Sequence, residues 1–106
     1  MGIIESYKVQ LRDKLHMKDL LNLHQIASNS SSSIYLYRNH MIADAENLPK
    51  LLSFFLTIKN DEIFTLLNDV PPEENPAKIM DFLDHESLNV LLKVDYQASD
   101  NESIVI

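Results

Sequence analysis

Residues 15–29 read Leu-His-Met-Lys-Asp-Leu-Leu-Asn-Leu-His-Gln-Ile-Ala-Ser-Asn, and the rest of the chain is organised around this stretch. Its apolar residues recur three and four positions apart, which is the spacing of an amphipathic helix with one buried stripe. The stripe consists of Leu20, Leu23 and Ala27, supported by Met17, Leu21 and Ile26. Asn29 and the serines that follow it predict the end of the helix.

His16 lies in the first turn of this expected helix. The first N–H groups of a helix have no partner within it, and the helix dipole gives that end a partial positive charge. An anion attached to the imidazole would therefore find donors in place, with the ammonium group of Lys18 close by. Two hypotheses follow: His16 is reversibly phosphorylated, or it is a histidine that merely begins a helix.

Length and composition exclude several classes of protein. A chain of 106 residues is long enough for one domain with one core, and its hydrophobic share of 45% is ordinary. No apolar run reaches the roughly 18 residues of a membrane span, and Glu5 interrupts the N-terminal apolar stretch, which argues against an export signal. A net charge of −7 with scattered lysines and arginines argues against nucleic-acid binding. The absence of cysteine excludes disulfides and thiolate metal sites and is typical of a cytoplasmic protein.

The other expected elements follow from alternation and from helical spacing. Strands are predicted at 7–11, 34–37, 41–45 and 62–67, and two further helices begin at Asn47 and Asn75. This order predicts an α+β fold, a two-layer open-faced sandwich in which a four-stranded antiparallel sheet carries three helices on one face. Because Gly2 is the only glycine, turns that need positive φ must use Asn or Asp. The expected breaks lie at Asn29, Asn39, Asn60 and Asn68.

The chain divides into a domain at 1–85 and a C-terminal extension at 86–106. The extension contains an apolar run at 90–94 and ends on Ser-Ile-Val-Ile, which is too apolar for a free tail. We expect it to add a strand or to cover an apolar surface. That surface belongs either to its own domain or to a second copy, in which case the extension makes a homodimer.

Three stretches and the order of the elements resemble HPr, the histidine-containing phosphocarrier of the bacterial sugar phosphotransferase system. They are Leu-His-Met-Lys at 15–18, Ile-Tyr-Leu-Tyr-Arg-Asn at 34–39 and Ala-Glu-Asn-Leu-Pro-Lys-Leu at 45–51. The resemblance runs from about residue 6 to about residue 85. It implies that His16 accepts a phosphoryl group from phosphorylated Enzyme I and passes it to sugar-specific acceptor proteins, and that Lys18 stabilises the phosphate. It also implies a carrier rather than a catalyst in its own right, without a cofactor.

Four positions depart from the pattern of that family. Lys18 stands where the family has an arginine, and Lys14 stands where a glycine is expected. Asp19 replaces a proline, and its carboxylate would repel an incoming dianion. Asn47 falls where Gram-positive members carry the serine of a regulatory kinase, so that reaction should be absent. Asp19, Lys14 and Asn47 favour the alternative function, an interaction or regulatory module with the HPr fold that has lost efficient phosphotransfer.

Met17, Leu48 and Leu52 are the expected partner-binding residues, with Phe55 beside them. Plain core packing is the alternative interpretation of the apolar residues in the second helix. The remaining histidines, His24, His40 and His85, are too widely spaced along the chain to predict a metal site.

Overall fold

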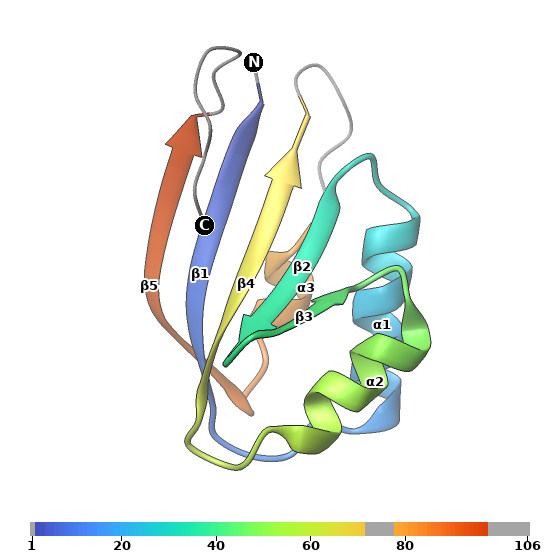
Figure 1. Cartoon of the computed structure of the whole chain (residues 1–106), viewed down its shortest axis with the longest axis vertical. Helices are drawn as coiled ribbons and strands as arrows, with labels where there is room; N and C mark the ends of the chain where they lie inside the picture. The colour runs from blue at the N-terminus through green and yellow to red at the C-terminus, as the bar shows by residue number, and fades with distance from the viewer. Residues whose placement is uncertain (1, 72–77, 98–106) are drawn as a thin grey trace.

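The structure is a computed structural model that describes residues 2–71 and 78–97. Its centre is one antiparallel sheet in the order β3-β2-β4-β1-β5. The strands are β1 (Ile3–Leu11), β2 (Ser33–Arg38), β3 (Met41–Asp44), β4 (Ile63–Val70) and β5 (Leu88–Gln97). Strands that are neighbours in the sheet are distant in sequence, except for the β2–β3 hairpin (Figure 1).

Three helices cover one face of this sheet. They are α1 (Met17–Ser28), α2 (Leu48–Thr57) and α3 (Met80–Leu83). Along β1, Tyr7, Val9 and Leu11 are buried in the same core as the apolar stripes of the helices, whereas the residues between them face away from it. The expected α+β architecture with helices on one side of an antiparallel sheet is therefore confirmed.

Aromatic packing joins α2 to the middle of the sheet. The rings of Phe54, Phe55 and Phe64 meet edge to face, with centroids 5.3 to 6.0 Å apart. All three side chains are buried. For Phe54 and Phe55 the structure thus favours the core-packing interpretation.

The sheet has five strands, where the sequence predicted four. Residues 88–97 form β5, which pairs antiparallel with β1 from Ile3↔Gln97 to Leu11↔Leu88, with a register shift at Lys8 and Val9. Part of the expected extension therefore completes the sheet of its own chain. Its apolar end, Ser-Ile-Val-Ile, lies outside the described residues.

Two other boundaries also differ from the prediction. β4 runs on to Val70 through the expected break at Asn68, because the buried Asn68 Nδ2 donates to Glu5 Oε1 on β1 at 2.9 Å. α3 is a single turn, and the predicted helix start at Asn75 lies outside the described residues. Positive φ occurs at Asn39, His40 and Asp61, so only one of the four expected asparagines takes that conformation.

None of the helices in the described part of the chain combines the length and the apolar character needed to cross a membrane.

Candidate functional site

His16 is the N-cap residue of α1, one position before the first helical residue. Its backbone is extended, with φ −84° and ψ 161°. Its carbonyl accepts from the N–H groups of Asp19 at 3.0 Å and Leu20 at 3.3 Å. The residue is exposed, so the imidazole of the predicted site is accessible at the N-terminus of the twelve-residue helix α1.

Two backbone donors remain at this helix end. Among the described residues, no acceptor is paired with the N–H groups of Met17 and Lys18. Such first-turn donors, together with the positive end of the helix dipole, can bind an anion. Lys14 and Lys18, which are close in sequence to His16, both have exposed side chains and carry positive charge.

Asp19 uses its two carboxylate oxygens for two different neighbours. Oδ2 accepts from the backbone N–H of His16 at 2.9 Å, which is one half of a capping box. Oδ1 lies 3.3 Å from Nε2 of His85. Nδ1 of His85 accepts from the Ser87 N–H at 3.0 Å, so in the neutral imidazole the proton is on Nε2, where it donates to Asp19.

Sequence reasoning missed this link between Asp19 and His85. In the sequence, Asp19 was identified only as a repulsive charge, and His85 only as a histidine too far along the chain from the others to predict a metal site. The contact carries no local signal, because it depends on how the segment between α3 and β5 returns to the start of α1.

An apolar recess of about 290 Å³ lies beside the start of α1. Met17 and Leu52, two of the expected partner-binding residues, both line it, and Met17 is 56% exposed. The third, Leu48, lies elsewhere, in a shallow depression with His24 and Asn47. The recess is lined by Leu11, Lys14, Leu15, Met17, Leu20, Leu52, Phe55 and Leu56.

Leu56 is a member of this recess that sequence reasoning missed. It is 74% exposed, the highest value among the exposed large hydrophobic residues of the described chain. A signal was present, because Leu56 follows Leu52 by four residues and therefore shares its side of α2.

α2 begins where the sequence predicted, and Asn47 caps it, because the Asn47 Oδ1 accepts from the Lys50 N–H at 3.3 Å. It is exposed and offers an amide where a serine would offer a hydroxyl.

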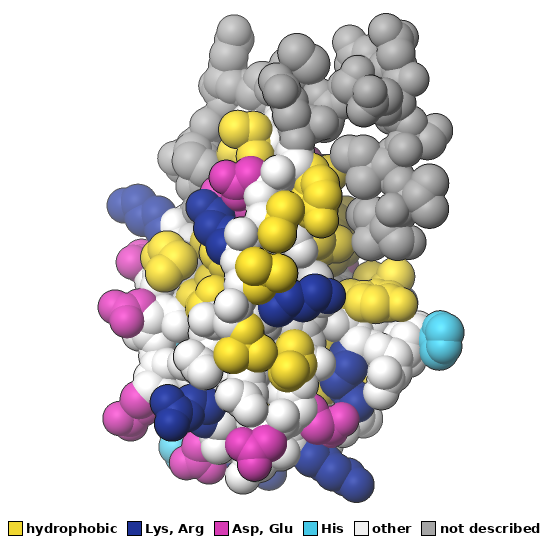
Figure 2. Space-filling model, turned by 90° about the vertical axis from the view of Figure 1, so that its left-hand side faces the viewer, with side chains coloured by type: hydrophobic (Ala, Val, Ile, Leu, Met, Phe, Trp, Pro, Cys, Tyr) yellow, Lys and Arg dark blue, Asp and Glu magenta, His cyan; other side chains and the backbone are white. Residues whose placement is uncertain are grey.

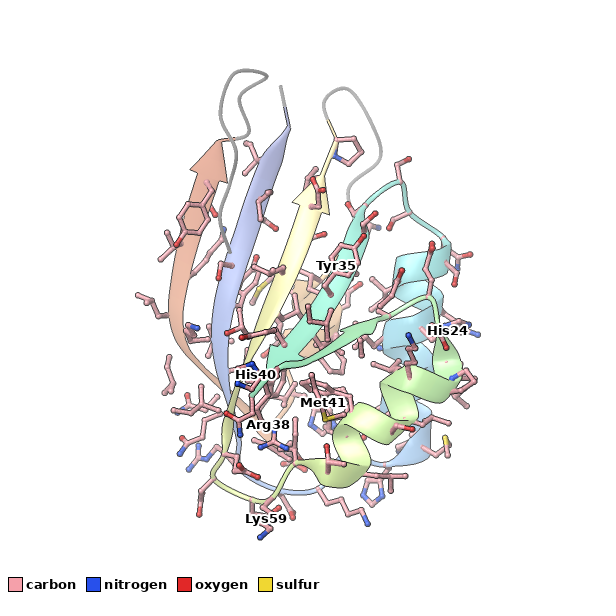
Figure 3. The ribbon with its side chains drawn as sticks, in the orientation of Figure 1. His24, Tyr35, Arg38, His40, Met41 and Lys59 are labelled. Atoms are coloured by element: carbon pink, nitrogen blue, oxygen red, sulfur yellow. The ribbon has the colours of Figure 1, made fainter. Side chains whose placement is uncertain are left out.

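The other two histidines lie away from His16. His24 Nδ1 is 2.9 Å from the carbonyl oxygen of Ala45, which ties α1 to the segment before α2. His40 sits at the tip of the β2–β3 hairpin with φ 68°, far from His24 (Figure 3). Within residues 2–71 and 78–97, no three His, Cys, Asp or Glu side chains are grouped so that they could hold a metal ion.

Comparison with known proteins gives no family assignment: no family model matches the chain, and neither a curated protein nor a solved structure matches it.

Proposed function

We propose that this protein is a divergent HPr-like phosphocarrier that accepts a phosphoryl group on His16 and passes it to a partner protein. The observation that carries the proposal is the exposed His16 side chain at the N-cap of α1, next to the unpaired N–H groups of Met17 and Lys18.

The order of the elements supports the resemblance. β1, α1, β2, β3, α2, β4 and α3 follow one another as expected for that family, and β5 is added at the end. β1 to β4 account for the four antiparallel strands of the expected sheet.

The chemistry required of the site is simple. The lone pair of a His16 ring nitrogen attacks phosphorus on phosphorylated Enzyme I, and the bond between phosphorus and the donor breaks as the donor keeps the electron pair. The phosphoryl oxygens on His16 accept from the Met17 and Lys18 N–H groups, and the Lys18 ammonium group balances their charge. The reverse displacement, with a sugar-specific acceptor protein as nucleophile, regenerates the free imidazole.

The recess beside the site is suited to partner docking. Met17 lies on α1 next to His16 in sequence, and Leu52 and Leu56 lie on α2. All three contribute apolar surface to the recess. An Enzyme I-like donor and the acceptor proteins would use this same surface in turn. In this proposal the protein works in the cytoplasm.

A second candidate function is an interaction or regulatory module with the same fold and without efficient transfer. The observation that favours it is the position of the Asp19 carboxylate, which contacts both the His16 backbone and His85. A negative charge so close to His16 would oppose the binding of a phosphate dianion there.

Phosphorylation by the host's own Enzyme I separates the two functions. The protein is incubated with phosphoenolpyruvate and that Enzyme I, and the product is tested for an acid-labile, base-stable phosphoryl group. The carrier function predicts such a group. Its absence would leave the interaction module as the supported function.

A further inference from the structure

Among the described residues, β5 is an edge strand of the sheet, and it carries exposed apolar side chains. The described sheet ends at β5, so the outer N–H and C=O groups of this ten-residue strand face away from β1. Leu92 is 54% exposed and Tyr96 is 49% exposed, and both lie on the sheet face opposite the helices, since they pair with Lys8 and Ile4. Figure 2 shows hydrophobic side chains gathered along this side of the molecule.

The opposite edge of the sheet is different. β3 has only four residues, and α2 packs against it. Long exposed edges are the ones that recruit another strand. β5 is therefore the edge on which a further strand can form.

We infer that β5 pairs antiparallel with β5 of a second copy about a two-fold axis at Val94, which makes one continuous sheet across a homodimer. This inference goes beyond the proposed function, because β5 lies at the sheet edge away from α1 and α2 (Figure 1).

Charge selects this register. In an antiparallel pair related by a two-fold axis, residues at equal distances from the axis lie opposite each other on the same face. With Val94 at the axis, Lys93 of each copy faces Asp95 of the other, twice per dimer. An axis at Lys93 or at Asp95 would instead place two like charges directly opposite each other, which is destabilising.

Both charged groups are available for this contact. The Lys93 ammonium group lies on the helix side of the sheet, 3.5 Å from Glu5 Oε2 and 3.7 Å from Asp95 Oδ1, and both Lys93 and Asp95 are exposed. A second copy adds another Asp95 carboxylate beside each ammonium group. On the other face, the same register places Leu92 opposite Tyr96, an aliphatic–aromatic cross-strand pair.

The pairing is confined to the regular part of β5. The register between β1 and β5 shifts at Lys8 and Val9, and beyond that shift the pairs run without interruption from Lys8↔Leu92 to Ile3↔Gln97. Val94 lies within this regular part.

Single-cysteine cross-linking tests the register directly, because the chain has no cysteine of its own. At the axis, the two copies of residue 94 have Cα atoms about 4.5–5.5 Å apart, within the range of a disulfide. The Val94→Cys variant is therefore expected to form a disulfide-linked dimer under mild oxidation. Leu92→Cys and Tyr96→Cys should each fail to form a disulfide-linked dimer alone, since their equivalent positions lie about 13 Å apart across the dimer, and they should cross-link when mixed with each other.

Ile42→Cys is the matched control, because Ile42 is an exposed residue on β3, the other edge of the sheet. If Val94→Cys fails to cross-link, or if it cross-links no faster than Ile42→Cys, the inference is overturned. Preferential linkage of Leu92→Cys alone would overturn the register as well.

Charge reversal gives an independent measurement on the full chain. Sedimentation should find a species of twice the 12.2 kDa chain mass. Lys93→Asp or Asp95→Lys alone should weaken dimerisation about tenfold or more, and the double reversal should restore it to within about threefold. A wild-type protein that stays monomeric at high micromolar concentration, or a double reversal as weak as the single ones, would refute the dimer. Circular dichroism of each variant shows that its fold is retained.

Discussion

Asp19 links the start of α1, where His16 lies, to the segment before β5. One oxygen caps the His16 N–H, and the other binds His85 from the segment before β5. The sequence identified Asp19 as a departure from the HPr pattern that the chain resembles, but it did not reveal the partners of Asp19, because the distance between α1 and His85 is set only by tertiary packing.

Replacing Asp19 by Asn separates its charge from its capping role. The Asn side chain keeps an oxygen that can accept from His16, whereas Pro would also remove the Asp19 N–H that donates to the His16 carbonyl at 3.0 Å. We expect Asp19→Asn to change stability by about 1 kcal/mol or less and to speed phosphorylation about fivefold, because a negative charge next to the incoming dianion is lost. Initial rates of phosphate incorporation check this, and an unchanged or slower rate would contradict the electrostatic argument.

The pair formed by Tyr7 and Lys93 predicts a loss of stability at alkaline pH. Burial and the Glu5 carboxylate raise the pKa of the Tyr7 phenol above 10.0, and the Tyr7 phenolate and Glu5 raise the pKa of Lys93 above 10.5. Both groups hold their protons more tightly in the folded protein than in the unfolded chain. Their contribution to folding stability is therefore complete at pH values below their ordinary pKa values and is lost as the pH rises through their raised pKa values. The Tm should fall as the pH rises above about 10, and less steeply in Tyr7→Phe, which cannot ionise. An equal fall in both proteins would contradict this assignment.

At the scale of elements, α1 and α2 were predicted correctly because their signals are local. The apolar spacing of Leu20, Leu23 and Ala27 and the capping residue Asn47 act within a few residues of each other. The predicted end of β4 was wrong because it depends on a contact between residues far apart in sequence. Asn68 is a turn residue by preference, but Glu5 on the neighbouring strand binds its amide and lets it stay inside the sheet.

The cap of α2 is worth testing because, under the proposed HPr-like function, Asn47 stands where the proposed family carries a regulatory serine. Asn47→Ala should destabilise the protein by about 1 kcal/mol, because the Lys50 N–H loses its acceptor, whereas Asn47→Ser should cost less than about 0.5 kcal/mol. Urea unfolding of the three proteins measures both values. If Asn47→Ala and Asn47→Ser lower the free energy of unfolding by the same amount, the side-chain cap does not contribute to stability.

At the scale of the whole molecule, the fifth strand is the main feature that the sequence left open. Its apolar run indicated contact with a surface, and two surfaces were equally consistent with it. Only the pairing with β1, which joins the two ends of the described chain, shows that the strand belongs to its own domain.

Leu88 and Leu92 give a matched test of how far β5 contributes to the core. Leu88 is buried against the helices, and Leu92 lies on the exposed face of the same strand. Leu88→Ala should therefore lower the free energy of unfolding by about 2–3 kcal/mol, and Leu92→Ala by less than about 0.5 kcal/mol. Equal losses in the two variants would mean that β5 does not pack as described.

The proposed function depends on one imidazole among the chain's four histidines. Phosphate incorporation from Enzyme I, measured in parallel on wild type and on His16→Ala, His24→Ala, His40→Ala and His85→Ala, tests it most directly. We predict one acid-labile phosphoryl group per chain in wild type, retention of labelling in the three other variants and its complete loss in His16→Ala. Undiminished labelling of His16→Ala would contradict the account.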